Sequence, residues 1–201
     1  GQARADGAPV PQPGATGEAR ADGALDDWLT VAELLTRLGA RVVPATPEEH
    51  DAAVAQISHL PHLVAAALAA AAGGPGLAGT LGAGSYRDAT RVAGSRPELV
   101  AAMCGGNAAA LRSVLDDLLD RLGEARGRLD YTDPIPAIAE WLRPGHHARS
   151  AWPPTGGEPR TLAADPDALL GLGRAGGWIT DVSPDRRTVA AVHPSPPAPG
   201  G

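Results

Sequence analysis

Apolar positions recur at helical spacing through the middle of the chain. Between residues 108 and 129, leucines and valines fall three or four positions apart, and arginines and aspartates occupy the opposite side. This pattern predicts a long amphipathic helix in a core or at a dimer interface. Upstream, the run TPEE at 46–49 is a capping box with proline at the first helical position, which predicts the start of another long helix. Pro61 interrupts that helix and should kink it around Ile57 and Ser58, because proline lacks an N–H and its ring clashes with the preceding turn.

The segments that flank this helical stretch have a different character. Glycine, proline, alanine and charge dominate the first residues, where ARADGA occurs twice, so that a disordered leader is expected. Thr30 and Glu33 have capping-box spacing ahead of an apolar run, which predicts a helix from about Trp28 that stops at Gly39. Residues 41–44 then read as a short strand. A lone helix and strand before an all-helical segment indicate the last piece of an α/β domain.

Together these patterns predict a mainly α protein with a small α+β tail. Downstream of the long helix we expect a hairpin around residues 183–185, and Asn107 is expected to cap the long helix itself. The expected segments are a disordered leader (1–27), the α/β remnant (28–45), a helical domain (46–129), a helical and α+β tail (130–193) and a disordered end (194–201).

Composition narrows the possible partners. The chain has 201 residues, a formal net charge of −6 and no lysine, which argues against nucleic acid or an acidic membrane surface as the main partner. Apolar residues make up 43%, mostly alanine, leucine and valine without phenylalanine, so the core should be thin and built from closely approaching helices. Cys104 stands alone in an apolar run and is expected to be a small buried hydrophobe in a cytoplasmic protein. The alanine run 64–72 is too short to span a bilayer.

Ionisable side chains gather in two places within the apolar helical region. His50 and Asp51 precede the run SHLPH at 58–62, which contains Ser58, His59 and His62. A metal site is disfavoured, because Asp51 and His62 would lie about 16 Å apart along a straight helix. A nucleophilic serine is disfavoured too, because Ser58 has neither a nucleophile elbow nor an orienting carboxylate. For His50 and His59, a structural hydrogen bond and a functional role remain equally open; for His62, next to the kinking proline, a functional role is favoured.

The second gathering is the run RDATR at 87–91, which we expect in a polar turn. Solvated charge is the ordinary interpretation, but Arg91 is followed at once by apolar residues, and Gly82 and Gly84 just before it allow a close backbone approach. An arginine in such a place presents a planar fork that binds a carboxylate bidentately. Arg87, Asp88 and Arg91 are therefore candidates for an anion site.

Two glycine patterns match G-x-G-x-x-G, at 74, 76 and 79 and at 171, 173 and 176. A dinucleotide fingerprint needs a preceding strand, a following helix and an acidic residue about 20 positions on. Neither pattern has that context, and the second lies at a predicted helix end. Neither is expected to bind phosphate.

The strings PEEHDAAVAQISHLPHLVAAAL and GSYRDATRVAGS, followed by an Asn-headed amphipathic helix, resemble the C-terminal helical domain of prephenate dehydrogenases, and the similarity covers residues 28–128. The resemblance implies a dimerisation domain of the 6-phosphogluconate-dehydrogenase C-terminal-like type, whose helices intertwine in a homodimer. It also implies that Arg91 binds a carboxylate of prephenate, a dicarboxylate. By the same resemblance, His62 lines the substrate pocket, Gly84, Arg87 and Asp88 shape its rim, and His50, Asp51, Ser58 and His59 support the site.

The same resemblance implies NAD or NADP as cofactor, bound by an N-terminal nucleotide-binding domain that has no visible counterpart here. No catalytic residue is therefore expected in this chain, which alone should be inactive and should not bind NAD. Many relatives have tryptophan at the position of Val100, and the RAGGWITDV segment at 174–182 is similar to the tails of actinobacterial members.

Two hypotheses for the function result. The chain is either a piece of a prephenate dehydrogenase, which converts prephenate to 4-hydroxyphenylpyruvate in tyrosine biosynthesis, or a non-catalytic helical dimer module that binds an anionic metabolite or a protein partner. The choices between NAD and NADP and between prephenate and arogenate stay open at this point.

Overall fold

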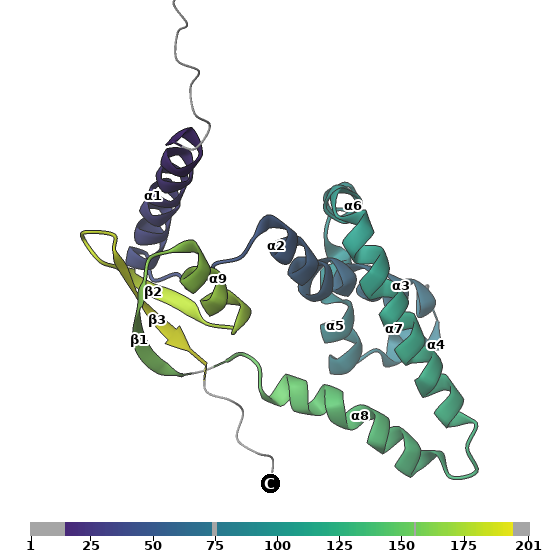
Figure 1. Cartoon of the computed structure of the whole chain (residues 1–201). Coiled ribbons are helices and arrows are strands. Elements are labelled where there is room, and N and C mark those ends of the chain that lie inside the picture. Colours follow the sequence, from purple (N-terminus) through teal and green to yellow (C-terminus); the bar gives the residue numbers. More distant parts are fainter. Residues whose placement is uncertain (1–14, 74–75, 155, 195–201) are drawn as a thin grey trace, which may run out of the picture. The chain divides into compact units, whose positions relative to one another are not determined.

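The computed structural model describes residues 15–73, 76–154 and 156–194 (Figure 1). They form two compact units. One is the continuous stretch Thr46–Ala151. The other combines the segment up to Ala45 with the segment from Trp152 onward. This grouping differs from the segments expected from the sequence, because the expected α/β remnant and the tail lie in one unit and the helical domain extends past residue 129.

The unit Thr46–Ala151 is entirely helical among its described residues. Its elements are α2 (Pro47–Val54), the π-helix η1 (Ala55–His59), α3 (Leu60–Ala71), α4 (Leu77–Leu81), α5 (Gly84–Thr90), the 3₁₀-helix η2 (Arg91–Gly94), α6 (Pro97–Gly106), α7 (Ala108–Leu129) and α8 (Pro134–Ser150). The predicted capping box is confirmed, since Thr46 Oγ1 accepts from Glu49 N–H at 3.2 Å and Glu49 Oε2 accepts from Thr46 N–H at 2.9 Å. The polar turn expected for residues 87–91 is wrong: Arg87 lies in α5, where its N–H donates to the Ala83 carbonyl.

The interruption predicted at Pro61 takes the form of a π-helical turn. The N–H of Leu60 reaches back five residues to the carbonyl of Ala55, one residue farther than in an α-helix. Because Pro61 has no N–H to give to Ile57, the helix widens just before the proline and recovers the α pattern in α3. This wide turn rotates His59 relative to the side chains that precede it.

The core of the helical unit is thin, as the composition predicts. Its buried apolar side chains are Ala55, Ala65 and Leu111, and small alanines let the helices approach closely. Many large apolar side chains remain exposed on the isolated unit, for example Ile57 at 75% and Ile135 at 79%. Exposed apolar side chains on this scale are typical of an interaction surface.

One described helical run, Pro47–Ala71, is long and apolar enough by length and composition to cross a membrane, with 25 residues that include an 18-residue window of mean hydropathy 1.4. The sequence reading considered only the alanine run 64–72 within it. Mostly buried core helices and signal sequences meet the same two criteria; in this run 17% of the apolar window is buried, and the run contains the π-helical turn and packs against α7 and η2.

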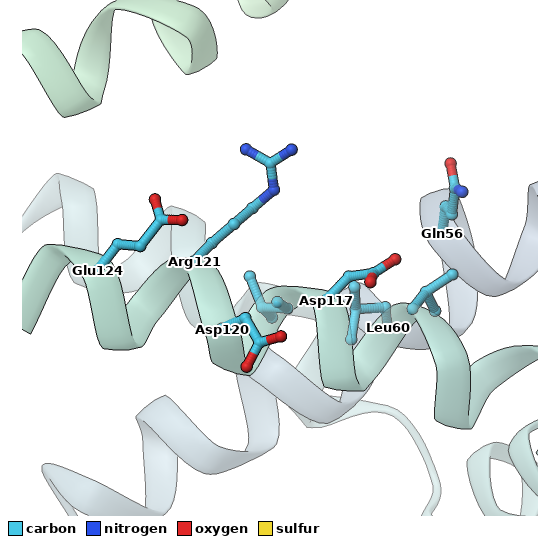
Figure 2. A pocket seen from close by; sticks show the side chains of 8 residues that line it. Gln56, Leu60, Asp117, Asp120, Arg121 and Glu124 are labelled. Carbon is cyan, nitrogen blue, oxygen red and sulfur yellow. The ribbon is translucent and has the colours of Figure 1, made fainter.

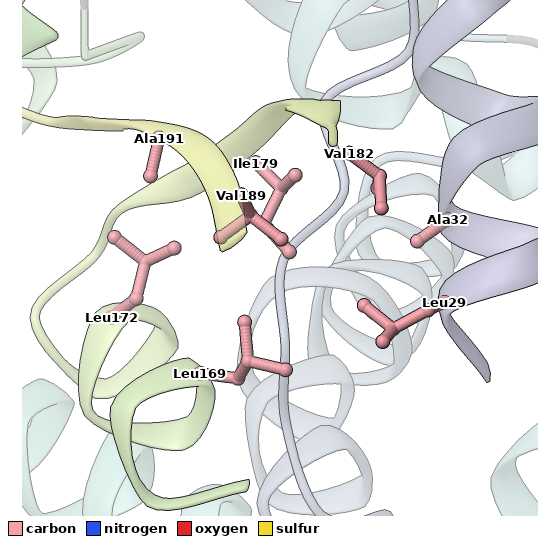
Figure 3. Close-up of a cluster of buried hydrophobic side chains, with 8 residues drawn as sticks. All are labelled: Leu29, Ala32, Leu169, Leu172, Ile179, Val182, Val189 and Ala191. Carbon is pink, nitrogen blue, oxygen red and sulfur yellow. The ribbon is translucent and has the colours of Figure 1, made fainter. Parts of the chain in front are cut away.

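The second unit is a small sheet covered by two helices on one face. Its elements are α1 (Ala15–Arg37), β1 (Glu158–Ala163), α9 (Pro166–Arg174), β2 (Trp178–Val182) and β3 (Thr188–His193). The strands are antiparallel in the order β1-β3-β2, and Val42 pairs with Ile179 at the free edge of β2. Figure 3 shows the buried cluster that joins the helices to the sheet. It consists of Leu29, Ala32, Leu169, Leu172, Ile179, Val182, Val189 and Ala191.

The structure of this unit bears on three of the sequence expectations. The hairpin around residues 183–185 is confirmed by the pairing of β2 with β3. The helix start at Trp28 is wrong, because α1 begins at Ala15 and the Thr30 hydroxyl donates to the Asp26 carbonyl inside the helix. Of the expected disordered ends, residues 1–14 and 195–201 lie outside the described residues.

The second glycine pattern has a packing role in this unit. A Cβ at Gly173 would collide with the carbonyl of Pro44, so that α9 approaches the 41–44 segment closely only because this residue is glycine. Gly176 ends the helix with φ of +76°, a left-handed conformation that favours glycine. Both positions thus serve the fold.

Candidate functional site

His59 is held at the centre of the helical unit by Asn107. Its side chain is 7% exposed and lies on the π-helical turn, and its Nδ1 is 3.3 Å from Asn107 Nδ2. The same amide nitrogen donates to the backbone carbonyl of Asp51 at 2.7 Å. Asn107 therefore connects three elements, namely α2, the turn η1 and the start of α7.

This arrangement selects one tautomer of His59. A carbonyl only accepts, so the atom of Asn107 that faces Asp51 must be the NH₂ group. Its second hydrogen points to His59 Nδ1, which must then be the acceptor, and the neutral ring carries its proton on Nε2. Of the two roles left open for His59, the structure favours the structural hydrogen bond.

His62 stands three residues further along and faces a cavity. The cavity has a volume of about 270 Å³, and its walls come from α3, η2 and α6. The lining residues are His62, Leu63, Ala66, Val92, Ala93, Ser95, Pro97, Val100, Ala101 and Cys104. His62 Nδ1 is buried, and within the described parts of the chain it has no hydrogen-bond partner. A buried, unpaired ring nitrogen is costly to a fold. Because the side chain that carries it lines this cavity, we treat the cavity as a candidate binding site.

Arg91 begins the 3₁₀-helix that forms one wall of this cavity. Val92 and Ala93, the next two residues, line the cavity directly, whereas the Arg91 side chain is exposed and is not among the lining residues. The structure therefore brings His62 together with the segment that Arg91 heads.

The other predicted site residues lie away from the cavity lining. Arg87 Nε and Asp88 Oδ1 are 3.5 Å apart, with both side chains more than three-quarters exposed. A Cβ on Gly84 would meet only Arg87 Nη2, at 3.8 Å, so the structure imposes no glycine at that position.

His50 and Asp51 form an exposed neighbouring pair on α2, with Nδ1 and Oδ1 3.2 Å apart. Ser58 is half-buried in η1. Across the residues that the structure describes, no three His, Cys, Asp or Glu side chains gather as a metal site.

Two residues that sequence reasoning did not assign to a site belong to this region. Asn107 was expected to cap α7, but its side chain makes no cap hydrogen bond and serves His59 instead. Cys104, predicted to be a buried hydrophobe, is half-buried and lines the cavity, and burial raises the pKa of its thiol. The raised pKa keeps the thiol protonated and weakly nucleophilic.

A second hollow lies between η1 and α7 (Figure 2). It has a volume of about 580 Å³, an apolar floor of Leu60, Val114 and Leu118, and a polar rim. We call it the acidic groove. Its rim consists of Gln56, Asp117, Asp120, Arg121 and Glu124.

Comparison with known proteins is consistent with this architecture. Residues 46–143 match the family model described as prephenate dehydrogenase, dimerization domain. A cyclohexadienyl dehydrogenase of Zymomonas mobilis is 37% identical over 108 residues, which are 51% of this chain and 37% of that protein.

Two solved structures are similar as well. A Corynebacterium glutamicum protein described as a prephenate dehydrogenase has 42% identity and a TM-score of 0.60, over 65% of this chain and 41% of that one. The arogenate dehydrogenase of Synechocystis has 32% identity and a TM-score of 0.57, over 63% of this chain and 48% of that one. The chain thus spans less than half the length of each of these three relatives.

Proposed function

Residues 46–143 are the dimerization domain of a prephenate dehydrogenase family protein, and from this premise we propose that the chain supplies the dimer interface and the substrate carboxylate site of an NAD(P)-dependent prephenate dehydrogenase. The overall reaction would be the oxidative decarboxylation of prephenate to 4-hydroxyphenylpyruvate in tyrosine biosynthesis. Arogenate is the second candidate substrate, because one similar structure is an arogenate dehydrogenase. The protein would work in the cytoplasm as a homodimer.

The observation that carries this proposal is the placement of His62, whose buried Nδ1 has no partner among the described residues, in the lining of a cavity walled by the helix that Arg91 heads. The cavity walls are otherwise mostly apolar, which suits the ring of a small cyclic acid. At the cavity mouth, Arg91 would bind one carboxylate of the substrate bidentately. The His62 side chain lines the same cavity and would contact the same molecule.

We assign the cofactor to a separate nucleotide-binding domain. The second glycine pattern of this chain does not fit a dinucleotide site. The carbonyl of Pro44 occupies the space beside Gly173, and Gly176 ends a helix. The other pattern begins at Gly74, which lies outside the described residues. The role of this chain in the reaction would be to bind and orient the acidic substrate against that domain.

A chimeric enzyme tests the proposal. Residues 46–151 of this chain would replace the matching segment of the Corynebacterium glutamicum protein, and formation of reduced nicotinamide would be followed with prephenate and with arogenate. We expect turnover with at least one of them. Arg91→Ala in the chimera should raise KM strongly, by about a hundredfold for a lost bidentate carboxylate contact, and leave the KM for the nucleotide nearly unchanged.

Arg112→Ala is the matched control, since Arg112 is also an exposed arginine of this domain but lies on α7, and neither it nor its chain neighbours line the cavity. It should leave both KM values unaltered. A folded, dimeric chimera without turnover, beside an active parent enzyme, would favour the non-catalytic dimer module instead. An unaltered KM in Arg91→Ala would remove the carboxylate role from Arg91.

A further inference from the structure

Two walls of the cavity that His62 lines come from helices far apart in the sequence. One wall is α3, which contributes His62 close to its start. Another is α6, which contributes Ala101 and Cys104 close to its end. The shape of the cavity therefore depends on where the start of α3 and the end of α6 are held. Both of these helix ends lead directly to one contact, between His59 and Asn107.

This contact lies about one helical turn from each wall. His59 immediately precedes α3, Asn107 immediately follows α6, and Asn107 Nδ2 lies 3.3 Å from His59 Nδ1. His62 comes three residues after His59, and Cys104 comes three residues before Asn107, which corresponds to about 4.5 Å of helical rise in each case. A displacement of either partner of the contact would therefore move a wall of the cavity with it.

The last turn of α6 contributes little to this placement by itself. It ends in Gly105 and Gly106, which have no side chain to pack, and a Cβ at either position would have no other atom within 4 Å. Glycine is also a weak helix former, because its backbone loses the most conformational freedom on folding. Asn107 itself has left the helical conformation, with φ of −118° and ψ of 33°. The anchor at this end of α6 is accordingly the side chain of Asn107.

The groups that hold this anchor are themselves firmly placed. His59 is 7% exposed and lies on the π-helical turn, in which the N–H of Leu60 donates to the Ala55 carbonyl. Asn107 Nδ2 also donates to the Asp51 carbonyl at 2.7 Å, so that α2 holds the same amide. A buried imidazole that loses its partner destabilises the fold, which favours retention of the contact in the folded chain.

We propose that Asn107 is a positioning residue of the candidate substrate cavity. Through His59 it holds the start of α3 and the end of α6 at a fixed separation, and this separation sets the width of the cavity between His62 and Cys104. Asn107 is not among the residues that line the cavity, so it acts through its partners and not by contact with the bound molecule. The inference rests on the proposed function only in taking this cavity as the site of the acidic substrate.

Alkylation of Cys104 in the full chain tests the positioning role. This thiol lines the α6 wall, and the chain has no other cysteine. Asn107→Ala frees the end of α6, so Cys104 should react with iodoacetamide at least about fivefold faster than in the unaltered chain at the same pH. His59→Leu removes the acceptor of the contact and should give a similar increase. His59→Asn provides a side-chain oxygen that can accept in place of Nδ1, and it should keep most of the unaltered rate.

Thr46→Ala is the matched control for a general loss of stability. It removes the capping box of α2 in the same unit but outside the cavity lining, and it should change the alkylation rate less than about twofold. The double variant Asn107→Ala, His59→Leu should react no faster than either single variant, because both changes remove the same contact. The inference is wrong if Cys104 reacts equally fast in Asn107→Ala and Thr46→Ala, or if the two single effects add in full.

Protection of Cys104 by prephenate connects the width of the cavity to substrate binding. A molecule that fills the cavity shields the thiol, so the prephenate concentration that halves the alkylation rate measures its affinity for the full chain. Asn107→Ala should raise this concentration at least about tenfold, because small displacements of positioning groups are costly to binding geometry, and Thr46→Ala should leave it unchanged. Equal protection of Asn107→Ala and the unaltered chain would contradict the inference.

The two measurements separate the inference from the proposed function. If neither prephenate nor arogenate slows alkylation of the unaltered chain, the cavity is not the substrate site, and the proposed function loses the observation that carries it. The response of the unliganded alkylation rate to Asn107→Ala then still decides whether Asn107 positions the walls of the cavity. If prephenate protects the thiol but Asn107→Ala changes neither the rate nor the protection, the positioning role fails while the proposed function stands.

Discussion

The amide of Asn107 lies 3.3 Å from Nδ1 of His59, and this contact ties the head of α7 to the π-helical turn that precedes His62. Asn107 also donates to the Asp51 carbonyl at 2.7 Å, so one side chain contacts both the widened turn and the helix α2 that precedes it. Because His59 and His62 are three residues apart, the orientation of the first constrains the direction in which the second enters the cavity.

Removal of Asn107 should destabilise the helical unit. Asn107→Ala leaves Nδ1 of the buried His59 without a partner, which costs about 1–3 kcal/mol of the free energy of unfolding. Asn107→Asp has nearly the same shape but only accepts, so its carboxylate would face the Asp51 carbonyl, and it should not restore stability. Urea denaturation measures the loss. Ser113→Ala, an exposed change on the same helix, should stay within about 0.5 kcal/mol. Equal stability of Asn107→Ala and Ser113→Ala would show that the contact does not support the fold.

Two glycines of α9 should respond in opposite ways to alanine. At Gly173 a Cβ collides with the Pro44 carbonyl, so Gly173→Ala should cost about 2 kcal/mol or more of stability. At Gly171 a Cβ would have no other atom within 4 Å, so Gly171→Ala should stabilise the helix by about 0.5–1 kcal/mol. Chemical denaturation followed by tryptophan fluorescence, including that of the buried Trp178, would measure both. A Gly173→Ala variant as stable as Gly171→Ala would contradict the close packing of α9 on the 41–44 segment.

The thiol of Cys104 should ionise at a higher pH in the folded chain than in the unfolded chain. Burial beside the cavity raises its pKa, and an unperturbed thiol ionises near about 8.5. The folded state therefore favours the protonated thiol. This contribution to stability is fully present below the pKa of the unfolded thiol and is lost as the pH rises through the higher folded pKa.

The rate of alkylation against pH reports this ionisation without ambiguity, because Cys104 is the only cysteine of the chain. The urea-unfolded chain is the reference, and its alkylation should become fast at a lower pH than that of the folded chain. A folded midpoint at or below the unfolded one would show that the thiol is solvated rather than buried beside the cavity.

Local sequence signals predicted much of the helical unit. The capping box at Thr46 involves residues three positions apart, and Pro61 affects the turn immediately before it, so both could be inferred without any partner element. The prediction failed at Asn107, which has the residue type and place of a helix cap. Its two actual partners lie 56 and 48 residues away in the sequence, and spacing carries no information about contacts of that range.

At the candidate site too, the sequence predicted local features and missed contacts between distant segments. Sequence reasoning singled out His62 and Arg91 by their neighbours and by resemblance, and it gave no indication that Cys104 of α6 lines the same cavity. It also treated residues 28–45 and the tail as separate segments. Leu29 and Ile179 nevertheless share one buried cluster, because the strands of the tail need an apolar cover and α1 provides it.

By itself the sequence determined that a helix begins after Thr46, that it is interrupted just before Pro61 and which family the middle segment resembles, because capping, proline geometry and apolar periodicity act over a few neighbouring residues. Only the tertiary structure decided that the Asn107 side chain contacts His59, that the Pro44 carbonyl packs directly against Gly173 and that α8 keeps an exposed apolar side. Those outcomes depend on which distant segments meet, and that choice is made by the packing of the whole chain.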